Sequence, residues 1–145
     1  MIRTVLGDIA REEAGFTYPH EHILTRPPLW RIKEDPDYVL DSIPKILAEL
    51  ELFYEAGGRM IVDATAIDYG RDARDLIKVA EQTRIHIVAT TGFNRGDYAD
   101  DVVQGMSLDE RMAAAKRLQP EMCSCNMGSM NFGRYPIINR IKEWR

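Results

Sequence analysis

The chain has 145 residues, of which 45% are hydrophobic and 29% charged, as expected for a soluble domain large enough to bury a core. Its net charge of −4 at pH 7 argues against a nucleic-acid or polyanion partner, and no apolar run approaches the roughly 18 residues of a membrane span. The first residues lack the apolar segment of a signal peptide, and two cysteines are too few for a disulfide framework, so we expect a cytoplasmic protein.

The first part of the chain begins with a strand pattern and continues with a helix pattern. Residues 16–19 are expected to form a short strand, and a loop rich in proline and tryptophan follows at residues 26–30. Asp35 followed by Pro36 is typical of a helix start, because aspartate caps the first turn and proline is tolerated there. We therefore expect a long helix that ends before a pair of glycines and is kinked or split at Pro44.

The middle of the chain repeats this alternation. Residues 60–65 form a short apolar run bounded by glycine, which indicates a buried strand. Residues 71–83 are expected to form a helix with Leu76, Ile77 and Ala80 facing inward.

The rest of the chain continues with the same two patterns. Ser107 and Glu110 have the spacing of a capping box, which predicts a helix start. The remaining predicted elements are a strand at 85–90, a helix at 107–118, a strand at 121–126, a loop at 127–135 and a helix at 136–144. Strands separated by helices pair in parallel through right-handed crossovers, so we expect an α/β fold, either an open sheet or part of a barrel.

The sharpest chemical signal is the pair His20 and His22 at the end of the first predicted strand. Residues i and i+2 of a strand share one face, so the two imidazoles could bind one metal ion. The alternative is two ordinary histidines in a surface turn. A catalytic metal site needs at least one more protein ligand, which the neighbouring sequence does not supply.

Other polar residues lie in or after the next two predicted strands. Asp63 is either a site group or a buried structural acid, and we favour a structural role or one that supports a site from behind. Asp72 is expected to cap a helix. His86 stands between two isoleucines and is expected to pack within its strand. Asn94 and Arg95 follow a glycine after the strand at 85–90, where they could contact an oxygen-rich substrate.

The predicted strand at 121–126 carries both cysteines of the chain. Cys123 and Cys125 share one strand face, where they could bind zinc or serve as small core residues. Ser124 and Asn126 occupy the other face, and Ser129 lies in the glycine-containing loop that follows. One of the two faces must look toward any pocket.

Residues 1 to about 99 resemble the phosphotriesterase-like family of the amidohydrolase superfamily. The segments that carry the resemblance are IRTVLG at residues 2–7, GFTYPHEH at 15–22, VDAT at 62–65 with GRD at 70–72, and IVATTGF at 87–93. The resemblance implies a (β/α)8 barrel with a pair of metal ions, in which His20 and His22 match the ligands of the first strand. The family's bridging carboxylated lysine, two later histidines and late aspartate have no counterpart in this chain.

Residues from about 105 to 145 resemble instead a segment of the β-keto acid cleavage enzymes. The resemblance lies in residues 107–111, in PEMCS at 120–124 and in NMGSMNFG at 126–133. It implies another (β/α)8 barrel, with one zinc ion bound by His-x-His and a glutamate. The matching strand and loop line the substrate site in that family, so Ser124, Asn126 and Ser129 are candidate substrate-binding residues.

Together these patterns predict four β/α units, equivalent to half of a (β/α)8 TIM barrel. We expect residues 1–145 to form a single truncated domain of that type, with a seam near 100–105, where composition also changes.

The leading functional hypothesis is a metal-dependent hydrolase of the phosphotriesterase or lactonase type, incomplete in this chain. A divalent metal, most simply zinc, would activate water against an ester, lactone or phosphoester. One alternative is a zinc-dependent β-keto acid cleavage enzyme that uses acyl-CoA. The other is a non-catalytic half-barrel that dimerises to close the barrel. The first two hypotheses imply a small-molecule substrate, and none implies a nucleic acid or a membrane.

Overall fold

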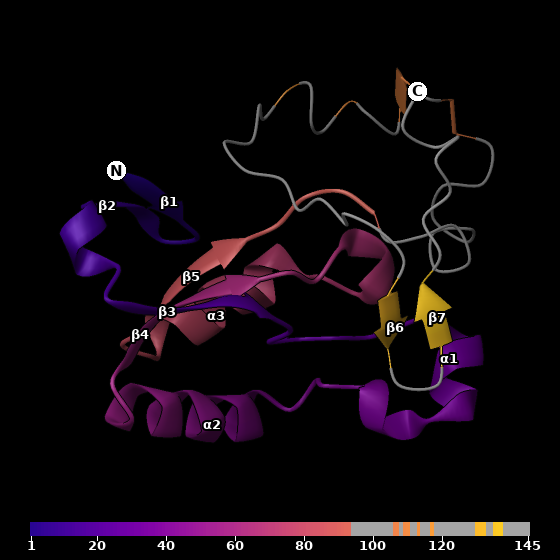
Figure 1. The fold of residues 1–145 in the computed structure, drawn as a ribbon, viewed down its shortest axis with the longest axis horizontal. Helices are drawn as coiled ribbons and strands as arrows, with labels where there is room; N and C mark the ends of the chain where they lie inside the picture. The colour runs from indigo at the N-terminus through magenta and orange to yellow at the C-terminus, as the bar shows by residue number, and fades with distance from the viewer. Residues whose placement is uncertain are drawn as a thin grey trace.

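A three-stranded parallel sheet forms the centre of the molecule (Figure 1). The computed structural model describes residues 1–93, 106, 107, 109, 110, 113, 117, 130–132 and 135–137. The sheet has the order β3 (Phe16–Glu21), β4 (Gly58–Asp63) and β5 (His86–Ala89), and both pairings are parallel. The mixed α/β fold with a parallel sheet is therefore confirmed in this part of the chain, and the three strands lie where the sequence predicts them.

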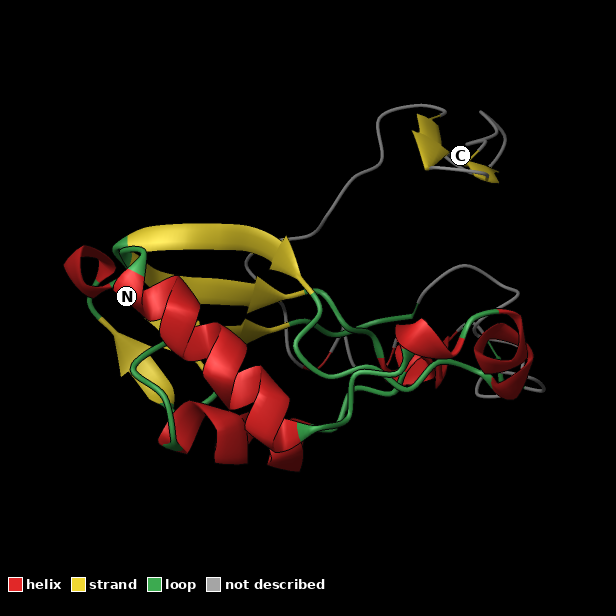
Figure 2. Cartoon of the chain, turned by 90° about the horizontal axis from the view of Figure 1, so that it is seen from below, coloured by secondary structure: helices red, strands yellow, loops and turns green. Residues whose placement is uncertain are grey.

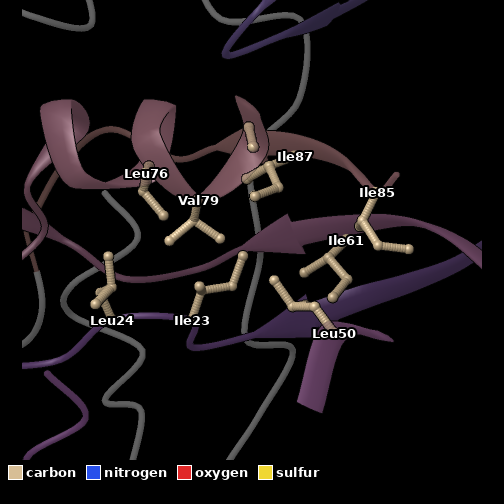
Figure 3. Packing of buried hydrophobic residues seen from close by; sticks show 9 residues of the cluster. Ile23, Leu24, Leu50, Ile61, Leu76, Val79, Ile85 and Ile87 are labelled. Carbon is tan, nitrogen blue, oxygen red and sulfur yellow. The ribbon is translucent and has the colours of Figure 1, made fainter. Parts of the chain in front are cut away.

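Two helices supply the crossovers between these strands and cover one face of the sheet (Figure 2). Helix α2 (Ile43–Glu55) joins β3 to β4, and α3 (Ala73–Glu81) joins β4 to β5. Ile61 and Ile87 from the strands pack with Leu50 of α2 and with Leu76 and Val79 of α3 (Figure 3). Burying each of these side chains contributes about 1.5–3 kcal/mol, so this layer fixes the sheet and the loops at its ends.

The long helix predicted from Asp35 onward, with a kink or split at Pro44, is split into two elements. Asp35 caps a short 3-10 helix, η2 (Pro36–Tyr38), as its sequence predicts. The backbone then becomes extended, and Leu40 pairs with Thr25 before α2 begins. Pro44 lies in the first turn of α2, where its missing N–H costs nothing, so the proline splits the predicted helix.

Two further details of the helices differ from prediction. A short helix, α1 (Leu29–Glu34), occupies part of the predicted loop at 26–30. In α3, Leu76 and Ala80 face the core as predicted, but Ile77 is 37% exposed and the fully buried residue is Val79. The buried positions are thus i, i+3 and i+4, which form one stripe on a helix.

The amino terminus forms a hairpin that the sequence analysis did not predict. Strands β1 (Ile2–Thr4) and β2 (Gly7–Ile9) are antiparallel, and η1 (Arg11–Glu13) follows them. The hydroxyl of Thr4 donates to the carbonyl of Gly7 across the turn at 2.7 Å. The hairpin is attached to the sheet by a hydrogen bond of 2.8 Å from Val5 N–H to the carbonyl of Ile87.

Beyond residue 93 the described stretches are short. The predicted capping box is present, since Glu110 N–H donates to Ser107 Oγ and the Glu110 carboxylate accepts from Ser107 N–H. Strands β6 (Met130–Phe132) and β7 (Tyr135–Ile137) form an antiparallel pair. The predictions of a loop at 127–135 and of a helix starting at residue 136 are therefore wrong there. Phe132, Tyr135 and Ile137 are of residue types that favour strands.

The predicted strand at 121–126 lies outside the described residues. Among those that are described, no helix combines the length and apolar character needed to cross a membrane.

Candidate functional site

The carboxyl ends of the three parallel strands lie together at one edge of the sheet. Glu21 pairs with Asp63, and Asp63 pairs with Ala89. Two backbone hydrogen bonds continue this alignment past the strands, from Ala64 N–H to the Glu21 carbonyl at 2.7 Å and from Thr90 N–H to the Asp63 carbonyl at 3.1 Å. Sites in α/β folds form at this edge because the loops converge there.

His20 and His22 stand next to one another at the end of β3. Their ring centroids are 5.6 Å apart and their planes are nearly perpendicular, at 82°. His20 is exposed and His22 is half-buried. The structure therefore brings the two predicted metal ligands together, with one imidazole open to solvent and the other held by its surroundings.

His22 contacts residues from the loop after β4. Its Nδ1 lies 3.1 Å from the hydroxyl oxygen of Thr65, and its ring packs edge-on against Tyr69 with 5.4 Å between centroids. Burial lowers the pKa of His22, an effect partly opposed by the nearby Asp63 carboxylate. The imidazole is thus favoured in its neutral form, which is the form that binds metal ions.

Asp63 lies behind the histidine pair and is fully buried. Its Oδ1 accepts hydrogen bonds from Ile23 N–H at 3.0 Å and from the Thr65 hydroxyl at 2.9 Å. Within the described part of the chain, Oδ2 has no hydrogen-bond partner. Burial raises the pKa of Asp63, although hydrogen bonds from Ile23 and Thr65 act in the opposite direction. The expectation that Asp63 supports the site from behind agrees with this placement.

The loops after β3, β4 and β5 are tied to one another. Arg26 N–H donates to the carbonyl of Tyr69 at 2.9 Å, which joins the first two loops. Gly70 follows with a φ of +88°, a conformation that glycine adopts readily. The guanidinium of Arg71 donates to the carbonyl of Thr90, which joins the second loop to the third. These contacts give the strand ends a fixed arrangement.

The histidine pair supplies part of a metal-ligand set. Because Thr65 engages Nδ1 of His22, the other ring nitrogen, Nε2, is the one placed to bind a metal. A catalytic zinc site takes three protein ligands. In the part of the chain that the structure describes, no group of three or more His, Cys, Asp or Glu side chains could hold a metal ion. A complete centre needs at least one donor besides this pair.

The other predicted site residues fall into two groups. Asp72 caps α3 as expected, by accepting from the N–H groups of Arg74 and Asp75, and His86 lies at the amino end of β5, away from the histidine pair. The remaining residues lie outside the described part of the chain: the predicted substrate-binding residues Asn94, Arg95, Ser124, Asn126 and Ser129, and the cysteines Cys123 and Cys125.

The sequence analysis missed Thr65 and Tyr69, which contact His22 directly. One signal could have indicated Thr65: it follows Asp63 by two positions at the end of a buried strand, where a polar side chain needs a hydrogen-bond partner. No comparable signal marks Tyr69, because its contact depends on how the loop after β4 folds.

Comparisons with known proteins give a consistent family. A sequence model described as the Phosphotriesterase family matches residues 1–122. A phospho-furanose lactonase from Mycoplasmopsis agalactiae is 30% identical over 101 residues, which are 68% of this chain and 28% of that protein. The crystal structure of a lactonase from Listeria monocytogenes has a TM-score of 0.63 and 37% identity, over 76% of this chain and 36% of that one. The chain thus spans well under half the length of these relatives.

A separate, short match supports the second resemblance. A 3,5-dioxohexanoate:acetyl-CoA acetone transferase from Paraburkholderia graminis is 55% identical over 38 residues, which are 26% of this chain and 12% of that protein. The match is closer in identity than the lactonase matches but covers much less of the chain.

Proposed function

The chain belongs to the phosphotriesterase family, and on that premise we propose that it carries part of the active site of a metal-dependent hydrolase. The observation that supports this most directly is the side-by-side placement of His20 and His22 at the carboxyl edge of the parallel sheet. The proposed substrates are lactones, carboxylic esters or phosphoesters. The two lactonases described above favour the lactone class.

We propose zinc as the metal, with His20 and His22 as two of its ligands. Neutral imidazole nitrogen is a preferred zinc donor, and the buried surroundings of His22 favour its neutral form. A divalent metal at this edge would lower the pKa of a bound water and polarise the electrophilic carbon or phosphorus. His20 and His22 would hold the metal, and Asn94 and Arg95 are proposed to contact the substrate.

The missing donors lead to a proposal about architecture. We propose that β3, β4 and β5 are the first three strands of a (β/α)8 barrel and that this chain supplies four of the eight β/α units. The remaining strands would lie outside residues 1–145, and we propose a second copy of this chain as one source of them. Sedimentation of the purified protein tests this arrangement, because a stable monomer that contains a complete metal centre contradicts it.

The metal site can be tested with matched histidine variants. Purified protein is loaded with zinc, desalted and analysed for metal content. We expect His20→Gln and His22→Gln each to reduce the bound zinc strongly, whereas His86→Gln retains it, because His86 lies at the other end of the sheet. Equal zinc content in all four proteins would show that the histidine pair does not bind the metal.

Activity on defined substrates separates the two enzymatic readings. The short transferase match favours carbon–carbon cleavage of a β-keto acid with acetyl-CoA as the alternative activity, again with a metal at His20 and His22. Turnover of lactones or phosphoesters without acyl-CoA supports the hydrolase. Turnover of a β-keto acid that requires acetyl-CoA supports the alternative.

A further inference from the structure

We infer that Thr65 and Asp63 are positioning residues that fix the tautomer of His22, with the hydrogen on Nδ1 and the lone pair on Nε2. The role of this tautomer in metal binding rests on the proposed function, because a metal ion binds the lone pair of a neutral imidazole. The inference itself concerns only hydrogen bonds within this chain. It can therefore be tested without a metal.

The direction of the hydrogen-bond chain follows from its donors. Oδ1 of Asp63 accepts from the backbone N–H of Ile23 at 3.0 Å, and an amide N–H can only donate. The same oxygen lies 2.9 Å from the Thr65 hydroxyl, whose single hydrogen satisfies this contact. The Thr65 oxygen is then left to accept from its other neighbour, Nδ1 of His22 at 3.1 Å. Nδ1 must therefore carry a hydrogen.

The burial of Asp63 and Thr65 maintains the donor-to-acceptor direction of these hydrogen bonds. Both side chains have no exposed surface, so water does not compete for their hydrogen bonds. Oδ2 of Asp63 has no partner among the described residues, and a protonated Asp63 would carry its hydrogen there. Oδ1 continues to accept from Ile23 and Thr65 in either charge state. The chain of bonds from His22 through Thr65 to Asp63 thus keeps one direction.

The ring of His22 is also held in place by packing. Tyr69 contacts it edge-on from the loop after β4, and His20 contacts it from its own strand. A fixed ring plane together with a fixed tautomer aims the lone pair of Nε2 in one direction. Without Thr65, the packing contacts remain but the tautomer is no longer selected.

The wild-type protein provides the first test. The full chain is labelled with ¹⁵N, and long-range ¹H–¹⁵N correlation spectra are recorded in the absence of metal. The pH is about two units above the ordinary histidine pKa of ~6.5, so that the imidazole of His22 is neutral. The chain has three histidines, so His20→Gln and His86→Gln assign the His22 signals. We expect His22 to show the Nδ1–H form, and the Nε2–H form would overturn the inference.

Substitutions at Thr65 provide the second test. Thr65→Val keeps the side-chain shape but removes the hydroxyl, and we expect it to convert His22 to a mixture of tautomers. Thr65→Ser retains the hydroxyl and should keep the wild-type spectrum, which a purely structural role for the side chain does not predict. Thr83→Val is the matched control, because the buried Thr83 hydroxyl has no hydrogen-bond partner in the described structure.

Zinc titration distinguishes failure of this inference from failure of the proposed function. We expect Thr65→Val to weaken zinc binding about 10–100-fold, with Thr65→Ser close to wild type. If the wild type binds no zinc but shows the expected tautomer, the metal site is wrong and the inference stands. If the histidine pair binds zinc and Thr65→Val changes neither tautomer nor affinity, the inference is wrong. If Thr65→Val does not fold, the wild-type spectrum decides.

Discussion

Gly70 lies where the loops after β3 and β4 come together, and its substitution tests that arrangement. A Cβ atom at this position would lie 2.6 Å from the backbone nitrogen and oxygen of Arg26. Neither atom belongs to a flexible side chain, so one loop has to move. Movement of Arg26 also breaks its hydrogen bond to the carbonyl of Tyr69. Gly70→Ala should therefore separate the two loops that carry the residues around His22.

The expected loss of stability has two parts. Alanine at the positive φ of Gly70 costs about 1–2 kcal/mol whatever the surroundings. Steric overlap with the Arg26 backbone adds about 1–3 kcal/mol, since packed atoms must shift to admit the methyl group. Gly57 is the matched control: its φ is +101°, but a Cβ there would have no neighbour within 4 Å. We expect a loss of about 1–2 kcal/mol for Gly57→Ala and about 2–5 kcal/mol for Gly70→Ala.

Urea unfolding followed by far-ultraviolet circular dichroism measures both losses by linear extrapolation. The difference between the two variants isolates the steric part, because both replace a glycine of positive φ. Gly70→Ala should also weaken zinc binding, since Tyr69 contacts the ring of His22. Equal losses for the two variants, or a Gly70→Ala protein as stable as the wild type, would refute the close approach of the loops.

Three further predictions test the core, a helix cap and a surface ion pair. Leu76→Ala should lower the free energy of unfolding by about 2–5 kcal/mol in urea, whereas Ile77→Ala should change it by less than about 1 kcal/mol, because only Leu76 is buried. Hydrogen bonds to Arg74 and Asp75 lower the pKa of Asp72 in the folded state, so its carboxylate stabilises the fold above the unfolded pKa of ~3.9 and loses this effect as pH falls through the folded pKa. The stability difference between wild type and Asp72→Asn should accordingly shrink on acidification, as measured by thermal unfolding at several pH values. A double-mutant cycle on Arg26 and Asp41 should give a coupling of about 0–1 kcal/mol that falls in high salt, because both side chains are largely exposed.

The elements that could be predicted from the sequence are those with a local signal. The strands around residues 61 and 87 contain short runs of strand-favouring apolar residues, of which Ile61 and Ile87 are buried in the core. Asp35 and Asp72 cap helices through contacts with residues two or three positions away, which spacing alone reveals. His20 and His22 are likewise local, because two positions along a strand return to the same face.

The parts that could not be predicted depend on contacts between distant segments. Thr65 meets His22 across 43 positions of the chain, and nothing in either local sequence specifies that meeting. The extended stretch before α2 is held by the pairing of Leu40 with Thr25, which overrides the helical pattern that continues through Val39. The pairing of β6 with β7 also depends on a contact outside the local sequence. The helix pattern over residues 136–144 does not reveal that residues 136 and 137 pair with the preceding strand.

The order of the strands bears on how the chain folds during synthesis. β3 pairs with β4 and β4 with β5, so in the described sheet every strand lies beside the one that precedes it in the chain. A nascent chain that has left the ribosome as far as residue 63 already contains β3 and β4, the two partners of the first pairing. It also contains α2, which lies between these strands in the sequence. The connections to be closed run over residues 22–57 and 64–85, and closure entropy grows only slowly with loop length. Assembly can therefore follow the direction of translation, one strand and one helix at a time.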